Sequence, residues 1–177
     1  MGVVFSLNSL LIMPLMGLSN GSQPVIGFNY GARQFNRVKQ SLFSAVALAT
    51  GIVVVLFVVI MASPAFFIRW FTSSQELIEV GSQGLRFFVL AFPLIGFQII
   101  GSNYYQATGR ASQSILLNMS RQTIFLIPII LLLPRMLGVT GVWLASPAAD
   151  ALSCAMTAVF IYFEVKDLTQ KELMLRE

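Results

Sequence analysis

The sequence predicts an all-α protein, a polytopic bundle of transmembrane helices. Of its 177 residues, 56% are hydrophobic and only 10% are charged, whereas soluble domains carry about 25% charged residues. The charges are also confined to short stretches between long uncharged runs. Most of these runs approach the roughly 20 residues that a helix needs to cross the hydrocarbon core. This pattern excludes a soluble enzyme, a disordered chain and a nucleic-acid-binding domain.

The uncharged runs predict five membrane spans, at about 3–18, 41–62, 84–106, 114–133 and 139–163. Residues 1–163 are therefore expected to form the membrane bundle, and residues 164–177 a charged cytoplasmic tail. The first span is short and is not preceded by a basic segment, so it does not resemble a signal peptide. It resembles instead the end of a longer helix.

Basic residues set the expected orientation, because cytoplasmic loops are enriched in Lys and Arg. One side carries eight of them: Arg33, Arg37, Lys39, Arg110, Arg121, Lys166, Lys171 and Arg176. The other side carries three: Arg69, Arg86 and Arg135. We expect a multi-pass protein of the cell inner (plasma) membrane with a cytoplasmic C-terminus. Its outside start without a targeting signal indicates a fragment, or one half of a split protein, with spans missing upstream.

Residue types that support catalysis or metal binding are scarce. The sequence contains no His and a single Cys, Cys154. One thiol cannot form an intrachain disulfide or a multi-cysteine metal site, so we expect it to pack as a small hydrophobic side chain. No nucleophile lies beside a base, and neither paired carboxylates nor a phosphate-binding loop occur. We therefore expect neither an enzyme nor a bound metal or cofactor.

Asp150 is the only acid inside a predicted span and lies near its middle. A charge at that depth costs about 2.5–3.5 kcal/mol on insertion scales, so it should face the bundle or water. One interpretation is a proton- or cation-responsive group in a cavity. The other is a structural acid that is paired or capped, since Pro147 frees a backbone carbonyl one turn earlier.

Three polar residues of the third span are further candidates for lining a cavity: Gln98, Asn103 and Gln106. Asn103 and Gln106 are three residues apart and share a helix face. Gln98 lies about 140° away from Asn103, so it is a candidate for an interhelical hydrogen bond.

Residues near the ends of two spans are assigned to the membrane interface. Tyr104 and Tyr105 are expected to belong to the interfacial aromatic belt. Arg121, at the head of the fourth span, is expected to extend its charge to the cytoplasmic surface. No basic residue is then expected at mid-depth in the last four spans.

The most distinctive segment is GLSNGSQPVIGFNYGAR, at positions 17–33. Glycines four residues apart allow close helix approach, and Ser, Asn and Gln side chains can satisfy the backbone groups that a proline frees. The segment predicts either a packed corner or a hinge that moves during transport. Its candidate residues are Gly21, Gln23, Pro24, Gly27, Asn29, Tyr30 and Gly31.

This segment resembles the signature of the MATE (multidrug and toxic compound extrusion) transporters. The matching positions are Gly17-Leu18-Ser19, Gly21, Gln23-Pro24, Ile26-Gly27, Asn29-Tyr30-Gly31-Ala32 and Arg37-Val38-Lys39. Two later stretches are similar to family segments as well: Phe97-Gln98, Gly101-Ser102, Gln106 and Gly109-Arg110-Ala111, then Gly138, Gly141-Val142-Trp143-Leu144-Ala145 and Pro147-Ala148-Ala149-Asp150.

The resemblance implies a twelve-helix fold with two six-helix lobes, of which this chain would supply helices eight to twelve. It also implies a cytoplasmic C-terminus, a missing N-terminal lobe as partner, and H+ or Na+ as coupling ion. The acid that many bacterial members use for coupling lies in the first helix and is absent here. The third span also lacks the acid that some branches carry in their tenth helix.

The leading hypothesis is part of a secondary active efflux antiporter that exports cationic or amphipathic organic compounds by alternating access. One alternative is a flippase for lipid-linked precursors in the same superfamily, which usually needs several basic residues in its cavity. Another is a non-transporting or truncated membrane subunit. No nucleic-acid partner is expected, whereas the lipid bilayer and a small organic substrate are.

Overall fold

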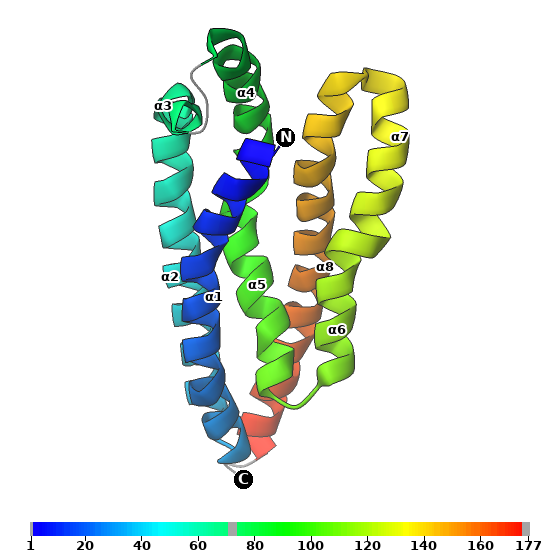
Figure 1. The fold of residues 1–177 in the computed structure, drawn as a ribbon. Helices are drawn as coiled ribbons and strands as arrows, with labels where there is room; N and C mark the ends of the chain where they lie inside the picture. Colours follow the sequence, from blue (N-terminus) through cyan, green and yellow to red (C-terminus); the bar gives the residue numbers. More distant parts are fainter. Residues whose placement is uncertain (1, 71–73, 175–177) are drawn as a thin grey trace.

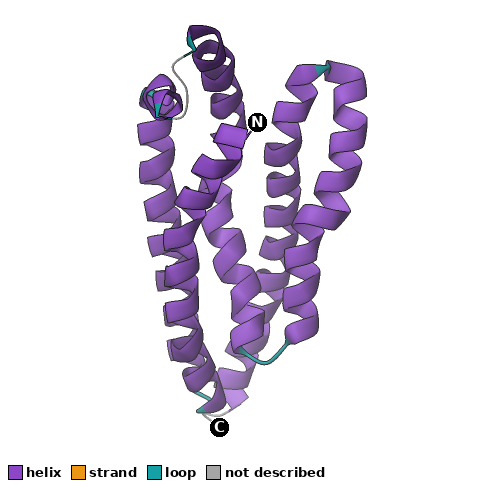
Figure 2. Ribbon diagram, viewed as in Figure 1, coloured by secondary structure: helices purple, strands orange, loops and turns teal. Residues whose placement is uncertain are grey.

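The computed structural model describes residues 2–70 and 74–174, and the regular elements in these ranges are helical (Figure 2). The α-helices are α1 (Gly2–Gly31), α2 (Phe35–Ala62), α3 (Pro64–Arg69), α4 (Gln75–Phe88), α5 (Phe92–Ala107), α6 (Ala111–Met119), α7 (Ile127–Leu137) and α8 (Val139–Met174). Two short segments have other helix types: η1 (Val89–Ala91) is a 3-10 helix and η2 (Ser120–Leu126) is a π-helix.

Four helical rods in the described ranges are long and apolar enough to cross a membrane: Phe35–Ala62, Leu77–Ala107, Ala111–Leu137 and Thr140–Met174. The second rod joins α4, η1 and α5, and the third joins α6, η2 and α7. α1 adds 30 residues, or about 45 Å of helix, and packs against α2 and α5. Each predicted span lies within one of these helices or rods, so the predicted helical membrane bundle is confirmed.

Two rods change helix type just before a proline. Pro93 and Pro128 each stand at the second position of the α-helix that follows. A proline has no N–H, and its ring clashes with the carbonyl four residues earlier. A turn of different pitch relieves this clash, and such turns are common at kinks. Figure 1 shows the rod of α6 and α7 changing direction near its middle.

The helices form two groups that meet at one end of the molecule (Figure 1). α1, α2 and the α4–α5 rod lie on one side, and α6, α7 and α8 lie on the other. Contacts of α8 with α5 and α2 join the groups. The α1–α2 turn, the α5–α6 connection and the end of α8 lie at the same end, marked C in Figure 1. These are the three regions that the basic residues assign to one side.

The core is densest where α2 meets α5 and α1. Val38 and Leu42 of α2 are buried there, and so is Ala49. A Cβ atom at Gly96 of α5 would lie 2.9 Å from the backbone nitrogen of Thr50. Only a glycine therefore allows these two helices to approach so closely.

The predicted solvated tail is part of the fold. α8 continues without a break to Met174, and Glu164 and Leu168 are both buried. Lys39 of α2 forms an ion pair of 2.9 Å with Glu172. Glu164 and Glu172 pair with basic residues outside α8. Charged residues in this segment therefore do not show that the chain leaves the bundle here. Residues 175–177, which include Arg176, lie outside the described residues.

Candidate functional site

Two adjoining pockets lie between the two groups of helices. The first has a volume of about 510 Å³ and borders Asp150, and the second has about 440 Å³ and borders Gln98. Both are lined by Ile12 of α1 and by Arg121, Gln122 and Thr123 of η2. We call the two pockets together the lobe cavity. Their volumes fall within the range of small-molecule sites, about 300–1,000 Å³.

Arg121 and Asp150 form an ion pair in the first pocket. The Arg121 Nε donates to Asp150 Oδ1 over 2.5 Å. The Arg121 side chain is 20% exposed and that of Asp150 is 4% exposed. In the described part of the chain the Arg121 guanidinium makes no second hydrogen bond, so its Nη groups are unused. The predicted pairing of Asp150 thus has a specific partner, and the acid also lines the cavity.

The expected position of Arg121 at the cytoplasmic surface is wrong. Arg121 stands ten residues into the rod that begins at Ala111, which places it about 15 Å along the helix. Its side chain turns to the acid of α8 rather than along its own helix. A buried carboxylate within reach stabilises a guanidinium more than extension to a distant surface. The expectation that the last four spans carry no basic residue at mid-depth is therefore wrong as well, because of Arg121.

Gln98 joins α5 to α8 in the wall of the second pocket. Its Nε2 donates to Ser153 Oγ over 2.9 Å, as expected for an interhelical hydrogen bond. Ser153 Oγ lies 3.4 Å from Ser120 Oγ, which donates to the Leu117 carbonyl. Gln98 Oε1 is buried and has no hydrogen-bond partner among the described residues. This oxygen has almost no accessible surface, so it is not offered to a ligand in the second pocket.

Asn103 and Gln106 differ in their surroundings although they share a helix face. Asn103 Nδ2 donates to Ser19 Oγ of α1, and Asn103 lines the second pocket. Gln106 is exposed and lines neither pocket. The structure thus brings Asp150, Gln98 and Asn103 to the lobe cavity and leaves Gln106 outside it.

The first predicted span was expected to end near residue 18. The structure instead continues α1 as a helix through most of the 17–33 segment, to Gly31. Pro24 is accommodated inside this helix. Asn29 Nδ2 donates to the Val25 carbonyl over 2.7 Å, and Ser22 Oγ donates to the Ser19 carbonyl over 2.8 Å. Side-chain hydrogen bonds of this kind satisfy carbonyl groups around a proline in a membrane helix.

The glycines of this segment are not equivalent. A Cβ atom at Gly27 would lie 2.9 Å from the Ala107 carbonyl oxygen, so α1 touches the end of α5 there. At Gly21 and Gly31 no described atom lies within 4 Å of the Cβ position. Gln23 is half-buried. Within this segment, close helix approach therefore depends on Gly27 and not on Gly31.

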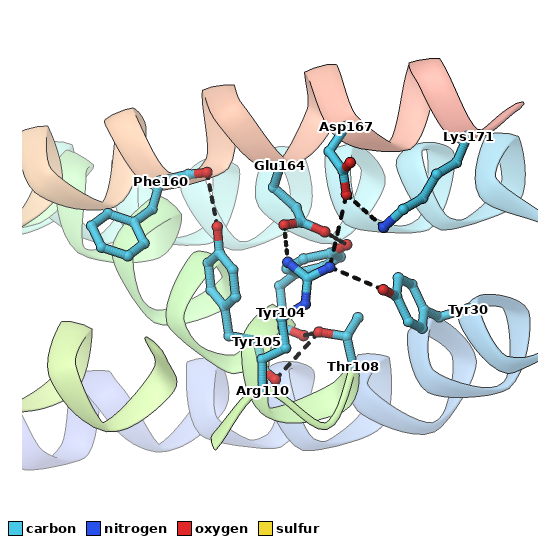
Figure 3. Close-up of polar contacts among 9 residues, drawn as sticks. All are labelled: Tyr30, Tyr104, Tyr105, Thr108, Arg110, Phe160, Glu164, Asp167 and Lys171. Carbon is cyan, nitrogen blue, oxygen red and sulfur yellow. Dashed lines mark hydrogen bonds and ion pairs between the residues drawn. The ribbon is translucent and has the colours of Figure 1, made fainter. Parts of the chain in front are cut away.

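A second charged cluster lies where the helices meet, and sequence reasoning missed it (Figure 3). Arg110 Nη1 donates to Glu164 Oε2, and Arg110 Nη2 donates to the Tyr30 hydroxyl over 3.0 Å. Tyr104 donates to Glu164 Oε1 over 3.0 Å. The only signal was the position of Arg110 and Glu164 at the edges of apolar runs. We call these four residues the Arg110 clasp.

The contacts of the Arg110 clasp favour the charged form of the arginine. Partial burial alone would lower the pKa of Arg110, but hydrogen bonds to Tyr30 and Glu164 and the charge of Glu164 raise it above its usual value. Asp167 lies 3.9 Å from Arg110 and is more exposed. The clasp therefore joins the end of α1, the α5–α6 connection and α8.

The expected interfacial position of the two tyrosines is wrong. Tyr104 and Tyr105 are almost fully buried. The Tyr105 hydroxyl donates a hydrogen bond to the Phe160 carbonyl over 2.8 Å, and the Tyr104 hydroxyl donates one to Glu164. Both hydroxyl groups find partners on α8, which makes burial of the rings favourable.

Comparison with known proteins places the chain in a family. The MatE family model matches residues 1–132. The multidrug export protein MepA of Staphylococcus aureus (strain MSSA476) is 26% identical over 167 residues, which is 94% of this chain and 36% of that protein. The chain thus spans little more than a third of the length of this curated relative.

Solved structures agree with the family match. The MATE multidrug transporter DinF-BH, solved as a ligand complex, is 37% identical, with a TM-score of 0.82 over 90% of this chain and 36% of that chain. An outward-facing MATE family transporter of the MOP superfamily is 20% identical, with a TM-score of 0.87 over 95% of this chain and 39% of that chain. The second likeness supports the fold alone. The predicted family is confirmed: the chain belongs to the MatE family of MATE transporters.

Proposed function

We propose that this chain forms most of one lobe of a secondary active multidrug efflux antiporter. The antiporter would export cationic or amphipathic organic compounds in exchange for H+ or Na+ by alternating access. It would lie in the plasma membrane with the C-terminus in the cytoplasm. The observation that carries the proposal is the lobe cavity with Asp150 in its wall.

The lining of the cavity suits amphipathic compounds. Phe88, Leu126 and Ile127 supply apolar surface in the first pocket, beside the charges of Arg121 and Asp150. Apolar walls with few polar groups are typical of small-molecule sites. Asp150 is the acid that could respond to H+ or a cation, as its position in a span indicates.

A second lobe is the proposed partner. This chain covers only 36% of MepA and of DinF-BH. We expect the missing lobe to close the lobe cavity from the other side and to carry the usual coupling acid. The chain alone is then expected to transport nothing.

Ion-gradient-dependent efflux of a cationic dye from vesicles tests the proposal. The chain assembled with its N-terminal lobe should export the dye, and the Asp150→Asn variant should do so at least about tenfold more slowly. Asp167→Asn is a matched control, because it removes an exposed acid from the same helix. Unchanged efflux in Asp150→Asn would remove this acid from the mechanism. Efflux by the chain alone would contradict the need for a second lobe.

The flippase alternative gains one observation from the structure. Arg121 lies in the cavity wall, so the cavity does contain a basic residue. It is a single cation and is paired with Asp150, whereas a pyrophosphate carries several negative charges. Efflux of small compounds therefore remains the better proposal. The alternative would be favoured by a transporter that moves a lipid-linked pyrophosphate across the membrane, away from a membrane-impermeant phosphatase, and exports no dye.

A further inference from the structure

We propose that Arg121 and Asp150 together form a subsite for zwitterionic amphipathic compounds, in which Arg121 binds the carboxylate of the transported molecule. This inference rests on the proposed efflux function and names a substrate class for its cavity. Sequence position alone does not predict such a role for Arg121. The structure places its guanidinium in the wall of both pockets.

The first step is the unused capacity of the guanidinium. An arginine has five N–H donors in a fixed fork, and Arg121 uses only Nε toward Asp150. Its two Nη groups make no hydrogen bond with a described residue. They are the pair of donors that binds a carboxylate in the bidentate arrangement. The side chain is 20% exposed, so a ligand in the cavity can reach them.

The second step is charge balance. A purely cationic compound that bound Asp150 would displace Arg121 and leave its charge without a counterion. A purely anionic compound that bound Arg121 would do the same to Asp150, which is 4% exposed. Loss of a counterion makes either compound bind less tightly, without excluding the cationic compounds of the proposed function. A zwitterion gives each member of the pair a partner of opposite sign.

The third step is the lining of the first pocket. Beside the two charges it offers Phe88, Leu126 and Ile127 for an aromatic or aliphatic body. Gln98 lines the second pocket with Arg121, but its Oε1 is too deeply buried for a ligand to reach.

A pair of dyes that differ in one charge tests the subsite. Rhodamine 6G is a cationic ethyl ester, and hydrolysis of that ester leaves a zwitterionic acid with the same ring system. The full chain would be placed in phosphatidylcholine nanodiscs near pH 7. Fluorescence anisotropy would give the Kd of both dyes, and the measured quantity is the ratio of the ester Kd to the acid Kd.

The decisive variant is Arg121→Gln with Asp150→Asn, which removes both charges and leaves none unpaired. We expect the ratio to fall about tenfold or more, because a bidentate arginine–carboxylate contact is lost. Arg121→Lys keeps the charge without the fork and should give an intermediate ratio. Arg135→Gln, an exposed arginine at the far end of the same rod, should leave the ratio unchanged.

Each result decides the inference separately from the efflux function. The subsite proposal is overturned if the ratio differs by less than twofold between the wild type and the double variant. It is also overturned if the zwitterionic acid does not bind the wild type at all. Efflux of the ester by the assembled transporter would then still support the function. If the assembled transporter exports neither dye, the proposed function fails, whatever the ratio measured on the chain.

Discussion

Among the described residues, Arg110 and Arg121 each form an ion pair with a buried acid of α8, and they differ in how fully their hydrogen bonds are used. Arg110 contacts Glu164, Tyr30 and Asp167, and Glu164 also accepts a hydrogen bond from the Tyr104 hydroxyl. Arg121 contacts only Asp150 in the described part of the chain. The first pair joins three segments of the fold and borders a separate pocket, whereas the second has unused donors in the wall of the lobe cavity.

This difference separates a structural ion pair from one available to a ligand. A fully satisfied polar network holds its members in one arrangement. A pair with unused donors beside a cavity can exchange partners at little cost. We therefore expect the Arg110 clasp to keep the helices together at one end while the Arg121 pair takes part in binding.

The largest effect on stability is expected from the Glu164→Ala variant. It leaves Arg110 without its main counterion and Tyr104 without its acceptor. Breaking a buried pair costs about 3 kcal/mol, or roughly 6–12 °C in Tm, measured by thermal unfolding in detergent. Asp167→Asn, at an exposed acid near the same arginine, should shift Tm by no more than about 2 °C. Equal shifts in the two variants would show that Glu164 has no special structural role.

The Gly27→Ala variant should have the next largest effect. The new Cβ would lie 2.9 Å from the Ala107 carbonyl oxygen, so α1 and α5 must move apart. Overpacking of this kind costs about 1–3 kcal/mol and should lower Tm in the same assay. Gly31→Ala is the control, because no described atom lies within 4 Å of that Cβ position. A stable Gly27→Ala variant would contradict the close contact.

A smaller effect is expected when a single hydroxyl group of the clasp is removed. Tyr104→Phe keeps the buried ring and deletes the hydrogen bond to Glu164, which should cost about 1–2 kcal/mol. Arg110 still neutralises the carboxylate, so the loss should be well below that of Glu164→Ala. A loss as large as in Glu164→Ala would mean that the tyrosine, not the arginine, holds the acid.

The smallest stability effect is expected from the double variant Arg121→Gln with Asp150→Asn. Replacing both members of a buried pair by neutral groups of similar size is often close to neutral. We expect the free energy of unfolding to change by less than about 1 kcal/mol, although dye binding changes. A loss as large as that of Glu164→Ala would make the Arg121 pair structural, like the clasp.

The helical membrane bundle could be predicted from the sequence because uncharged runs of sufficient length have few alternatives in a membrane. Asp150, Gln98 and Asn103 could be predicted as cavity candidates because a polar group in an apolar run is costly unless it faces a partner or water. The ends of the helices could not be predicted. Glu164 looked like the start of a tail, since its partner Arg110 lies 54 residues earlier in the chain.

Arg121 shows the same limit within a span. Its position near a loop suggested a surface anchor, because sequence spacing alone does not show which helix it faces. The Asp150 carboxylate on α8 determines where the guanidinium turns, and that contact depends on the packing of η2 against α8. The roles of Gly27 and Gly31 also depend on which helix lies opposite, so the glycine spacing could not distinguish them.

Thiol labelling at two positions can show which of the two regions binds a compound. Thr123 lines both pockets of the lobe cavity, and Gln113 lines a separate pocket beside Arg110. Thr123→Cys and Gln113→Cys would be made in a Cys154→Ser background, which removes the native thiol. Reaction rates with a water-soluble thiol reagent would be measured with and without saturating rhodamine 6G.

If the lobe cavity binds the transported compound, the dye should slow labelling of the Thr123→Cys variant at least about threefold, as expected when most of the thiol is covered at saturation. Labelling of the Gln113→Cys variant should not change. Equal rates with and without dye at Thr123→Cys, or slower labelling at Gln113→Cys alone, would contradict binding in the lobe cavity.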